Sequence, residues 1–266
     1  MLKDMSNGKS FKLKLLGTGT STGVPTVSCS CPTCLSDDNK DKRLRCSALI
    51  TYNNKNIIID TGPDFRQQLI KYNIQRLDAA IYTHHHFDHI GGFDDIRGIN
   101  FTTKSALPIY LNSETLDNLF RIFSYAFRGY NETGGGIPMV DVNKISDGDF
   151  YINGLKFTIL PLIHGTLRVL GFRIGDVAYC TDTNFIPEST LELMEDLDVL
   201  ILDGLRPKVH KTHFNIDQAI KLSNAINAKQ TYLTHIAHQI KHSEVEPNLP
   251  VGINLAYDGL TIQGRL

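Results

Sequence analysis

The sequence predicts an α/β fold in which two mixed β-sheets pack against each other and helices cover their outer sides. Three observations predict it: short apolar stretches typical of strands alternate with stretches of helical spacing, both halves of the chain contain both kinds, and no Pro/Gly/Ser-rich linker divides the halves. We therefore expect residues 1–266 to form one domain, at a length that lets a chain bury most of its apolar surface.

In the first half of the chain, predicted strands alternate with predicted helices. Short stretches rich in Ile, Leu or Tyr predict strands over residues 11–19, 44–52, 56–60, 79–83 and 108–112. Helical spacing predicts a helix through residues 64–72, with Pro63 in its first turn, and another over 113–127 with Ser113 as its cap. The GTGTSTG segment matches neither glycine-rich phosphate-binding pattern, so it predicts a tight turn after the first strand.

The second half repeats the mixture. Turn signals at Asn153-Gly154 and Gly175-Asp176 predict hairpins within residues 150–160 and 169–180. Further elements are predicted in the order helix 187–194, strand 199–204, a helix from Asn215 with Gln218 in a capping-box position, strand 231–235 and a last hairpin around Asp258-Gly259. Residues 20–43 and 128–147 have the composition of loops.

Composition limits the functions open to the chain. Hydrophobic residues make up 41% and charged residues 21%, as in ordinary globular proteins. There is no apolar run long enough to span a membrane and no secretory signal at the start, so we expect a cytoplasmic protein without a membrane partner. The net charge of −1, without a block of Lys and Arg, disfavours nucleic acid and favours a small substrate.

Residues 84–89, HHHFDH, have the spacing of metal ligands. His84 and His86 are two apart on the extension of a strand, so both imidazoles project from the same side and can reach one ion. Asp88 and His89 lie where the chain turns and face a second ion. Imidazole and carboxylate suit Zn, Mn or Fe(II) and leave coordination positions open. A solvated histidine-rich loop, the alternative, explains neither the apolar strand before the segment nor the glycines after it.

The five cysteines are unevenly placed. Cys29, Cys31 and Cys34 are close enough to share one tetrahedral ion, with a fourth ligand missing, and in a cytosolic chain such a cluster indicates metal before disulfides. Reduced loop thiols without metal are the alternative. Cys46 and Cys180 have apolar strand neighbours, so we expect them to be buried small residues.

The THHHFDH segment resembles the signature of the metallo-β-lactamase superfamily, and IIIDTG, LPLIHG, CTDT and LTH follow in that family's order over nearly the whole chain. The resemblance implies the metallo-β-lactamase fold, an αββα sandwich. It also implies two catalytic ions held by two ligand sets and one bridging carboxylate: His84, His86 and His164 for the first ion, Asp88, His89 and His235 for the second, and Asp182 between them. A shared anionic ligand offsets the repulsion of two close cations.

Two further residues of this region have expected roles outside the ligand set. The superfamily keeps an aspartate at the position of Asp60 beside the metals, so we expect it to orient a loop or a histidine. His85 is expected to point away from its neighbours.

Four segments, LLGTGTSTGVP, the CxCxxC loop, DTGPDFRQQ and THIAH, resemble one branch of the superfamily, the cyclic phosphodiesterases encoded in phosphonate-degradation operons. In that branch three cysteines and one histidine hold a structural zinc. The resemblance assigns these roles to Cys29, Cys31, Cys34 and His238.

A proton donor is expected beside the metals. In phosphodiesterase branches a histidine on a loop before the penultimate helix serves as general acid, and His213 matches that position. The resemblance therefore implies His213 and Asp182 as catalytic residues. His210 in the same loop is the other candidate for the acid, and both could instead be ordinary histidines at a helix start.

These features together predict a metal-dependent phosphodiesterase. Two Zn or Mn ions lower the pKa of a bound water and polarise the phosphoryl oxygen. The expected substrate is a small phosphodiester, such as a ribose 1,2-cyclic phosphate. The alternatives are a tRNA 3′-processing endonuclease, a carboxylester, thioester or lactone hydrolase, and a zinc- or redox-sensing module that is not an enzyme. The oligomeric state stays open, a homodimer included.

Overall fold

A computed structural model describes residues 10–127 and 136–266. In these residues two seven-stranded sheets form the centre of the molecule. The first sheet has the strand order β14 (Thr261–Arg265), β1 (Ser10–Gly17), β2 (Ser47–Tyr52), β3 (Lys55–Ile59), β4 (Ala79–Ile81), β5 (Leu107–Leu111) and β6 (Val140–Lys144). The second has the order β13 (Ile253–Leu255), β12 (Gln230–Thr234), β11 (Val199–Asp203), β10 (Val177–Cys180), β9 (Leu167–Ile174), β8 (Leu155–His164) and β7 (Asp149–Ile152).

Both sheets are mixed. Strands β3 to β6 run parallel in the first sheet and β10 to β13 run parallel in the second, while the remaining neighbours pair antiparallel. The carboxyl ends of neighbouring parallel strands meet at one edge of a sheet, where α/β proteins place their ligands. Each sheet therefore offers a row of strand ends on which a site can be built.

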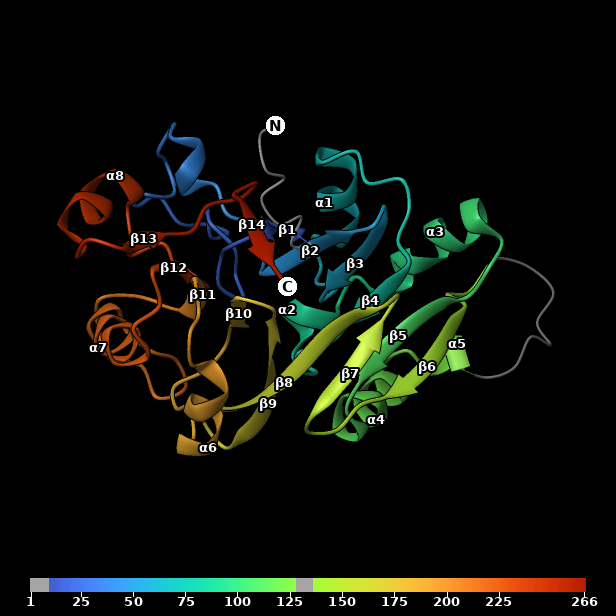
Figure 1. The fold of residues 1–266 in the computed structure, drawn as a ribbon. Helices are drawn as coiled ribbons and strands as arrows, with labels where there is room; N and C mark the ends of the chain where they lie inside the picture. Colours follow the sequence, from blue (N-terminus) through green and yellow to red (C-terminus); the bar gives the residue numbers. More distant parts are fainter. Residues whose placement is uncertain (1–9, 128–135) are drawn as a thin grey trace, which may run out of the picture.

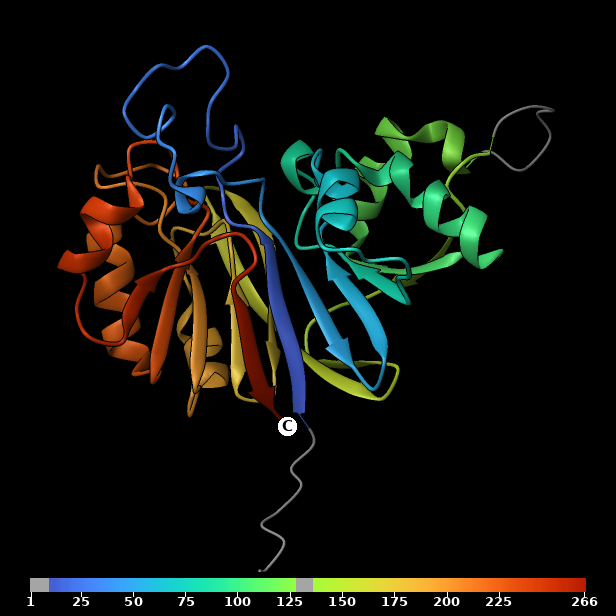
Figure 2. The ribbon, with the colours of Figure 1, turned by 90° about the horizontal axis from the view of Figure 1, so that it is seen from above.

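Helices cover the outer sides of the sandwich (Figure 1). Those on the first sheet are α1 (Phe65–Lys71), α3 (Ile96–Thr103), α4 (Ser113–Ile122) and α5 (Ser124–Phe127). Those on the second are α6 (Glu188–Leu191), α7 (Ile216–Ile226) and α8 (His242–Val245). A short helix, α2 (Phe87–Ile90), follows β4. Figure 2 shows the C-terminus at one end of the sandwich and the loop of residues 20–43 at the other. The expected α/β sandwich is confirmed.

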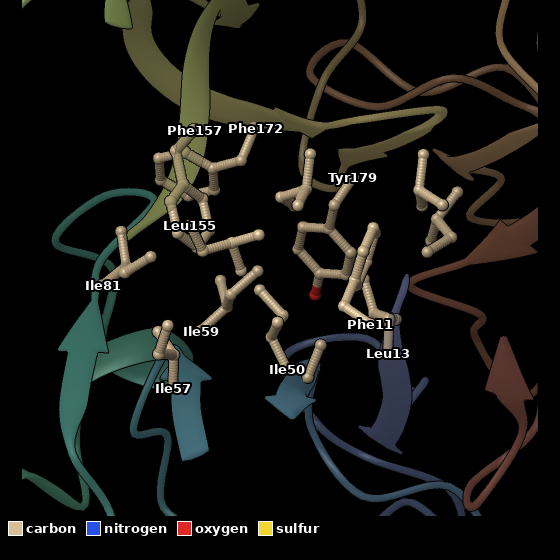
Figure 3. Close-up of a cluster of buried hydrophobic side chains, with 14 of the residues drawn as sticks. Phe11, Leu13, Ile50, Ile57, Ile59, Ile81, Leu155, Phe157, Phe172 and Tyr179 are labelled. Carbon is tan, nitrogen blue, oxygen red and sulfur yellow. The ribbon is translucent and has the colours of Figure 1, made fainter. Parts of the chain in front are cut away.

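The main core lies between the two sheets. Phe11 and Leu13 of β1 lie close to Tyr179 of the second sheet, and Ile59 and Ile81 lie on the side of Phe157 and Phe172 (Figure 3). Two further apolar clusters fill the space between each sheet and its helices. Burial on both faces explains why the strands are rich in Ile, Leu and Val, and it gives the strand ends a rigid base.

Several predicted elements differ from the structure. The helix expected over 113–127 is divided into α4 and α5, and its cap is Asn112, whose side chain accepts a hydrogen bond from the Thr115 backbone N–H. Pro63 precedes α1 rather than lying in its first turn, because the helix begins at Phe65. The capping box of Asn215 and Gln218 is confirmed.

Two predictions about strands were wrong. Part of the supposed loop 128–147 is strand β6, an edge strand whose polar alternation resembles a loop; residues 128–135 lie outside the described residues. Asp258-Gly259 does not close a hairpin, because β13 belongs to the second sheet and β14 pairs with β1 in the first. The turn instead carries the chain from one sheet to the other.

The glycine segment after β1 is tightly packed, as expected for a turn. A Cβ atom on Gly17 would lie 2.0 Å from the Arg45 carbonyl oxygen, so only glycine fits. Within the described residues, none of the helices has both the length and the apolar character needed to cross a bilayer.

Candidate metal centre

The strand ends of both sheets bring the predicted ligands together. His84 and His86 lie on the short segment between β4 and α2, and Asp88 and His89 lie on α2. From the second sheet come the last residue of β8 and residues just beyond β10 and β12: His164, Asp182 and His235. Residues more than 100 positions apart in the sequence thus meet where the two sheets end.

The ligand atoms form two groups that share one carboxylate. In each group the atoms lie within 4.8 Å of one another: His84, His86, His164 and Asp182 in the first, and Asp88, His89, Asp182 and His235 in the second. This is the division that the sequence resemblance implies, with Asp182 common to both. That these side chains hold metal ions stays a prediction.

Asp182 lies at the centre of the two groups. One of its oxygens, Oδ1, is 3.3 Å from His89 Nε2, and the other, Oδ2, is 3.3 Å from His235 Nε2. Oδ2 also lies 3.9 Å from His84 Nε2. The two oxygens therefore face nitrogens of both groups, which is the placement required of a bridging ligand.

A hydrogen-bond network fixes which nitrogen of each histidine faces the centre. Asp60, fully buried at the end of β3, accepts a hydrogen bond from His89 Nδ1 at 2.7 Å and one from the Thr83 hydroxyl at 2.8 Å. Because that hydroxyl donates to Asp60, its oxygen accepts from His84 Nδ1 at 2.9 Å. His164 Nδ1 donates to the Thr212 carbonyl at 2.6 Å. In all three rings Nε2 remains free for a metal.

Asp60 thus has the orienting position expected of it, acting on His89 directly and on His84 through Thr83. His85 belongs to none of the ligand groups found in the described residues.

The charges at the centre match a cation site. Burial opposes ionisation of Asp182, but the charges of His235 and His89 outweigh it and lower the pKa of the carboxyl well below its usual range. Burial lowers the pKa of His84 and keeps that imidazole neutral. Burial also disfavours a proton on His89, but Asp182 and Asp88 raise its pKa, so a bound cation would displace that proton.

Three site residues have a left-handed backbone. Asp60, Asp182 and His235 each directly follow or nearly follow a strand, and their φ angles are 63°, 51° and 57°. This conformation is costly for residues other than glycine and turns the chain sharply away from the strand direction.

The cysteine cluster forms a second, separate site. The thiols of Cys29, Cys31 and Cys34 lie 3.2, 3.5 and 3.6 Å from His238 Nδ1. A hydrogen bond from the Cys34 backbone N–H is the largest reason that the pKa of Cys31 is lowered to about 6, whereas burial raises the pKa of Cys34 to about 11. A bound cation would favour the deprotonated form of Cys34. Cys46 and Cys180 are buried, as expected.

Residues 55–236 match the family model of the beta-lactamase superfamily domain. The chain belongs to that superfamily. A solved structure described as a new diphosphatase from the PhnP family is 40% identical, with a TM-score of 0.90 and coverage of 97% of this chain and 98% of that one. The resemblance inferred from the sequence is thereby confirmed for the superfamily and for its PhnP-like branch.

Two other relatives bear on function. An octanoyltransferase of Porphyromonas gingivalis is 40% identical over 250 residues, which cover 92% of this chain but 50% of that protein. The chain thus spans about half the length of this curated relative. The human short-form tRNase Z has a TM-score of 0.68 and 16% identity, with coverage of 94% of this chain and 98% of that one, which shows a shared fold alone.

The residues of this superfamily member fit a pair of divalent cations. Nε2 of His84, His89 and His235 is buried in each case and has no hydrogen-bond partner among the described residues. A buried polar atom without a partner is costly, and all three face carboxylates. A metal-dependent hydrolase is the activity that this fold and donor set support.

The structure adds one site residue that the sequence analysis missed. Asp203, the last residue of β11, is fully buried and accepts a hydrogen bond at 2.6 Å from His213 Nδ1. The ring centre of His213 is 4.5 Å from that of His164 and 4.6 Å from that of His235. A signal was present, because Asp203 ends a buried strand as Asp60 and Asp182 nearly do.

Proposed function

We propose that the protein hydrolyses a phosphodiester in a small anionic substrate, with a cyclic phosphate such as a ribose 1,2-cyclic phosphate as the leading example. One observation carries the proposal: a histidine held by a buried carboxylate lies against both ligand groups. His213 is bonded to Asp203 through Nδ1, so its Nε2 is the nitrogen available to a substrate. This arrangement suits proton donation to a leaving oxygen.

The proposed division of labour follows from these positions. Two divalent cations, zinc or manganese, would be held by the two ligand groups around Asp182 and would supply an activated water and Lewis acidity. Asp60 and Thr83 hold His89 and His84 in the tautomers that ligate. His213 donates the proton to the departing alkoxide while Asp203 keeps the ring oriented.

A basic loop beside His213 favours an anionic substrate. Residues 206–211, RPKVHK, contain no acidic residue, although the whole chain has a net charge of −1. A surface pocket of about 350 Å³ is lined by Arg206, Pro207, Lys208 and Gln239. The loop is fixed at its base, since Ala237 N donates to the Leu205 carbonyl and Ile216 N donates to the Arg206 carbonyl. A fixed positive pocket binds phosphate groups well.

The proposed structural zinc has the residues it needs. Cys29, Cys31, Cys34 and His238 form one closed group of four protein ligands, typical of a zinc that stabilises a fold. The catalytic groups, by contrast, have the mixed histidine and carboxylate donors that leave room for substrate.

Acyl chemistry is the second candidate, because a relative named as an octanoyltransferase matches most of this chain. The match covers only half of that protein, so the activity in its name can belong to the other half. Hydrolysis of a thioester would also gain little from His213, since a thiolate departs without a proton.

A substrate panel tests the proposal. The purified protein, loaded with Zn²⁺ or Mn²⁺, should hydrolyse a ribose 1,2-cyclic phosphate and bis(p-nitrophenyl) phosphate far faster than an octanoyl thioester or a lactone. Asp182→Ala should abolish this activity. The reverse preference, retained by His213→Ala, would overturn the phosphodiesterase assignment and favour acyl chemistry.

A further inference from the structure

We propose that Asp203 positions two groups at once: the proton donor His213 and the predicted metal ligand His235. The half that concerns His213 rests on the function proposed above, whereas the half that concerns His235 does not. Asp203 is a positioning residue in this account, because it acts through the two imidazoles and touches no substrate.

The bond to His213 uses only one oxygen of the carboxylate. Asp203 Oδ2 accepts from His213 Nδ1 at 2.6 Å and from the Thr183 backbone N–H at 2.8 Å. The other oxygen, Oδ1, is buried and has no partner among the described residues. A buried carboxylate with a free oxygen is costly unless another donor reaches it.

Among the buried ligand histidines of the described residues, His235 is the one whose outer nitrogen lacks a partner. His84, His89 and His164 each donate Nδ1 to a hydroxyl, carboxylate or carbonyl oxygen. His235 directs Nε2 at Asp182 and Asp88, at 3.3 and 3.7 Å, while its Nδ1 is buried and has no hydrogen-bond partner in the described part of the chain. Metal-binding histidines ordinarily donate that second nitrogen to an oxygen.

Asp203 lies close to the His235 ring. One ligand atom each of Asp203, His213 and His235 lie within 4.8 Å of one another, and the two imidazoles are stacked at 13°. The placement is built into the sheet, because Asp203 of β11 pairs with Thr234 of β12, the residue before His235. In this proposal Oδ1 of Asp203 serves His235 Nδ1 directly or through one bridging water.

A shared carboxylate has a definite chemical effect. It favours a proton on Nδ1 of both rings, which leaves His213 Nε2 to face the substrate and His235 Nε2 to face a cation. Removing the negative charge of Asp203 should then weaken both proton donation by His213 and metal binding by His235. Removing the His213 ring should weaken proton donation alone.

The test compares Asp203→Asn, His213→Ala and the double variant. Metal affinity is measured by competition of Zn²⁺ or Mn²⁺ with a chromophoric chelator. We expect Asp203→Asn to bind the catalytic metals about 10–100-fold more weakly and His213→Ala to bind them as the wild type does. At saturating metal both single variants should lose kcat on a ribose cyclic phosphate while keeping most of it on bis(p-nitrophenyl) phosphate. The double variant should lose no more than His213→Ala.

Two control variants and one measurement on the wild-type protein complete the test. Asp258→Asn alters another carboxylate that accepts one backbone N–H and one threonine hydroxyl, and it should leave metal affinity unchanged. Asp203→Glu keeps the charge and should retain more metal than Asp203→Asn. In the zinc-loaded wild-type protein, ¹⁵N spectra of the histidine rings should show His235 and His213 protonated at Nδ1, independently of whether any variant folds.

Three results would overturn the proposal. If Asp203→Asn binds metal as tightly as the wild type, or if the His235 ring is protonated at Nε2, Asp203 does not position His235. If the fold-loss of kcat in the double variant equals the product of the two single losses, Asp203 and His213 act separately. If the wild type cleaves neither phosphodiester while Asp203→Asn still loses metal, the proposed function and the His213 half fail and the His235 half stands.

Discussion

His235 and His238 lie on one segment after β12, three residues apart, and their rings join two different ligand clusters. Between them Ile236 accepts a hydrogen bond from Thr20 N at 3.1 Å and donates one to the Thr18 carbonyl at 2.9 Å. The chain that leads into the cysteine loop and the chain that carries a catalytic ligand are thus tied together at one point.

The first prediction concerns the cysteine cluster at this connection. Cys31→Ser should lower the zinc content by one ion per chain and lower Tm by more than about 5 °C, because a structural zinc contributes folding free energy. Metal analysis and thermal unfolding measure both effects. Cys180→Ala, which alters a buried thiol remote from the cluster, should keep the zinc content of the wild type. An unchanged zinc content in Cys31→Ser would show that the cysteine cluster does not bind zinc.

The second prediction concerns the catalytic ions. His86→Ala and Asp182→Ala should each remove most phosphodiesterase activity and reduce the bound catalytic metal, with the larger loss for Asp182→Ala since it belongs to both groups. Metal content after reconstitution and kcat are the measurements. His85→Ala, one residue away, is the matched control and should stay active. Wild-type turnover in Asp182→Ala would contradict the two-metal assignment.

The third prediction uses the leaving group. His213→Ala should reduce kcat on a ribose cyclic phosphate by about 10²–10⁴, because an alkoxide needs the proton. The loss on bis(p-nitrophenyl) phosphate should be small, because p-nitrophenolate departs without one. Equal losses on the two substrates would mean that His213 positions the substrate rather than donating a proton.

The fourth prediction tests the basic loop. Arg206→Ala should raise KM for a ribose cyclic phosphate that carries an additional phosphate by about tenfold, the effect of losing one charged hydrogen bond. The value of kcat should change little. Lys156→Ala, an exposed cation on β8, serves as the control and should leave KM unaltered. A KM that does not respond to Arg206→Ala would exclude the pocket from substrate binding.

The fifth prediction is a pH dependence of stability. Burial raises the pKa of Asp258 to about 6, against hydrogen bonds from Leu44 N and Thr18 that favour the charged form. The folded state therefore holds this proton more tightly than the unfolded state, and its contribution to stability is lost as pH rises from about 4 to about 6. The stability of the wild type relative to Asp258→Asn should fall by up to about 3 kcal/mol over that range. Denaturant unfolding of both metal-free proteins at pH 4 to 7 measures it, and a difference independent of pH would refute the assignment.

Local patterns made much of the site predictable. The spacing of His84, His86, Asp88 and His89 is set by one strand end and one helical turn, so the sequence alone indicated the cluster. Asp203 was missed because its role depends on the pairing of β11 with β12, a contact that no local pattern contains. Strand β6 was missed because an exposed edge strand needs few apolar residues. The false hairpin at Asp258-Gly259 had the correct turn residues but flanking strands that belong to different sheets.

The left-handed backbone at Asp60, Asp182 and His235 has an evolutionary consequence. Each position costs of order 1–3 kcal/mol of strain for a residue with a side chain, and glycine would remove it. Selection for stability alone therefore runs against all three side chains, so only continued use of the site retains them. In descendants that have lost the activity, glycine should accumulate first at these three turns, and the apolar strands that lead into them should outlast the chemistry they once supported.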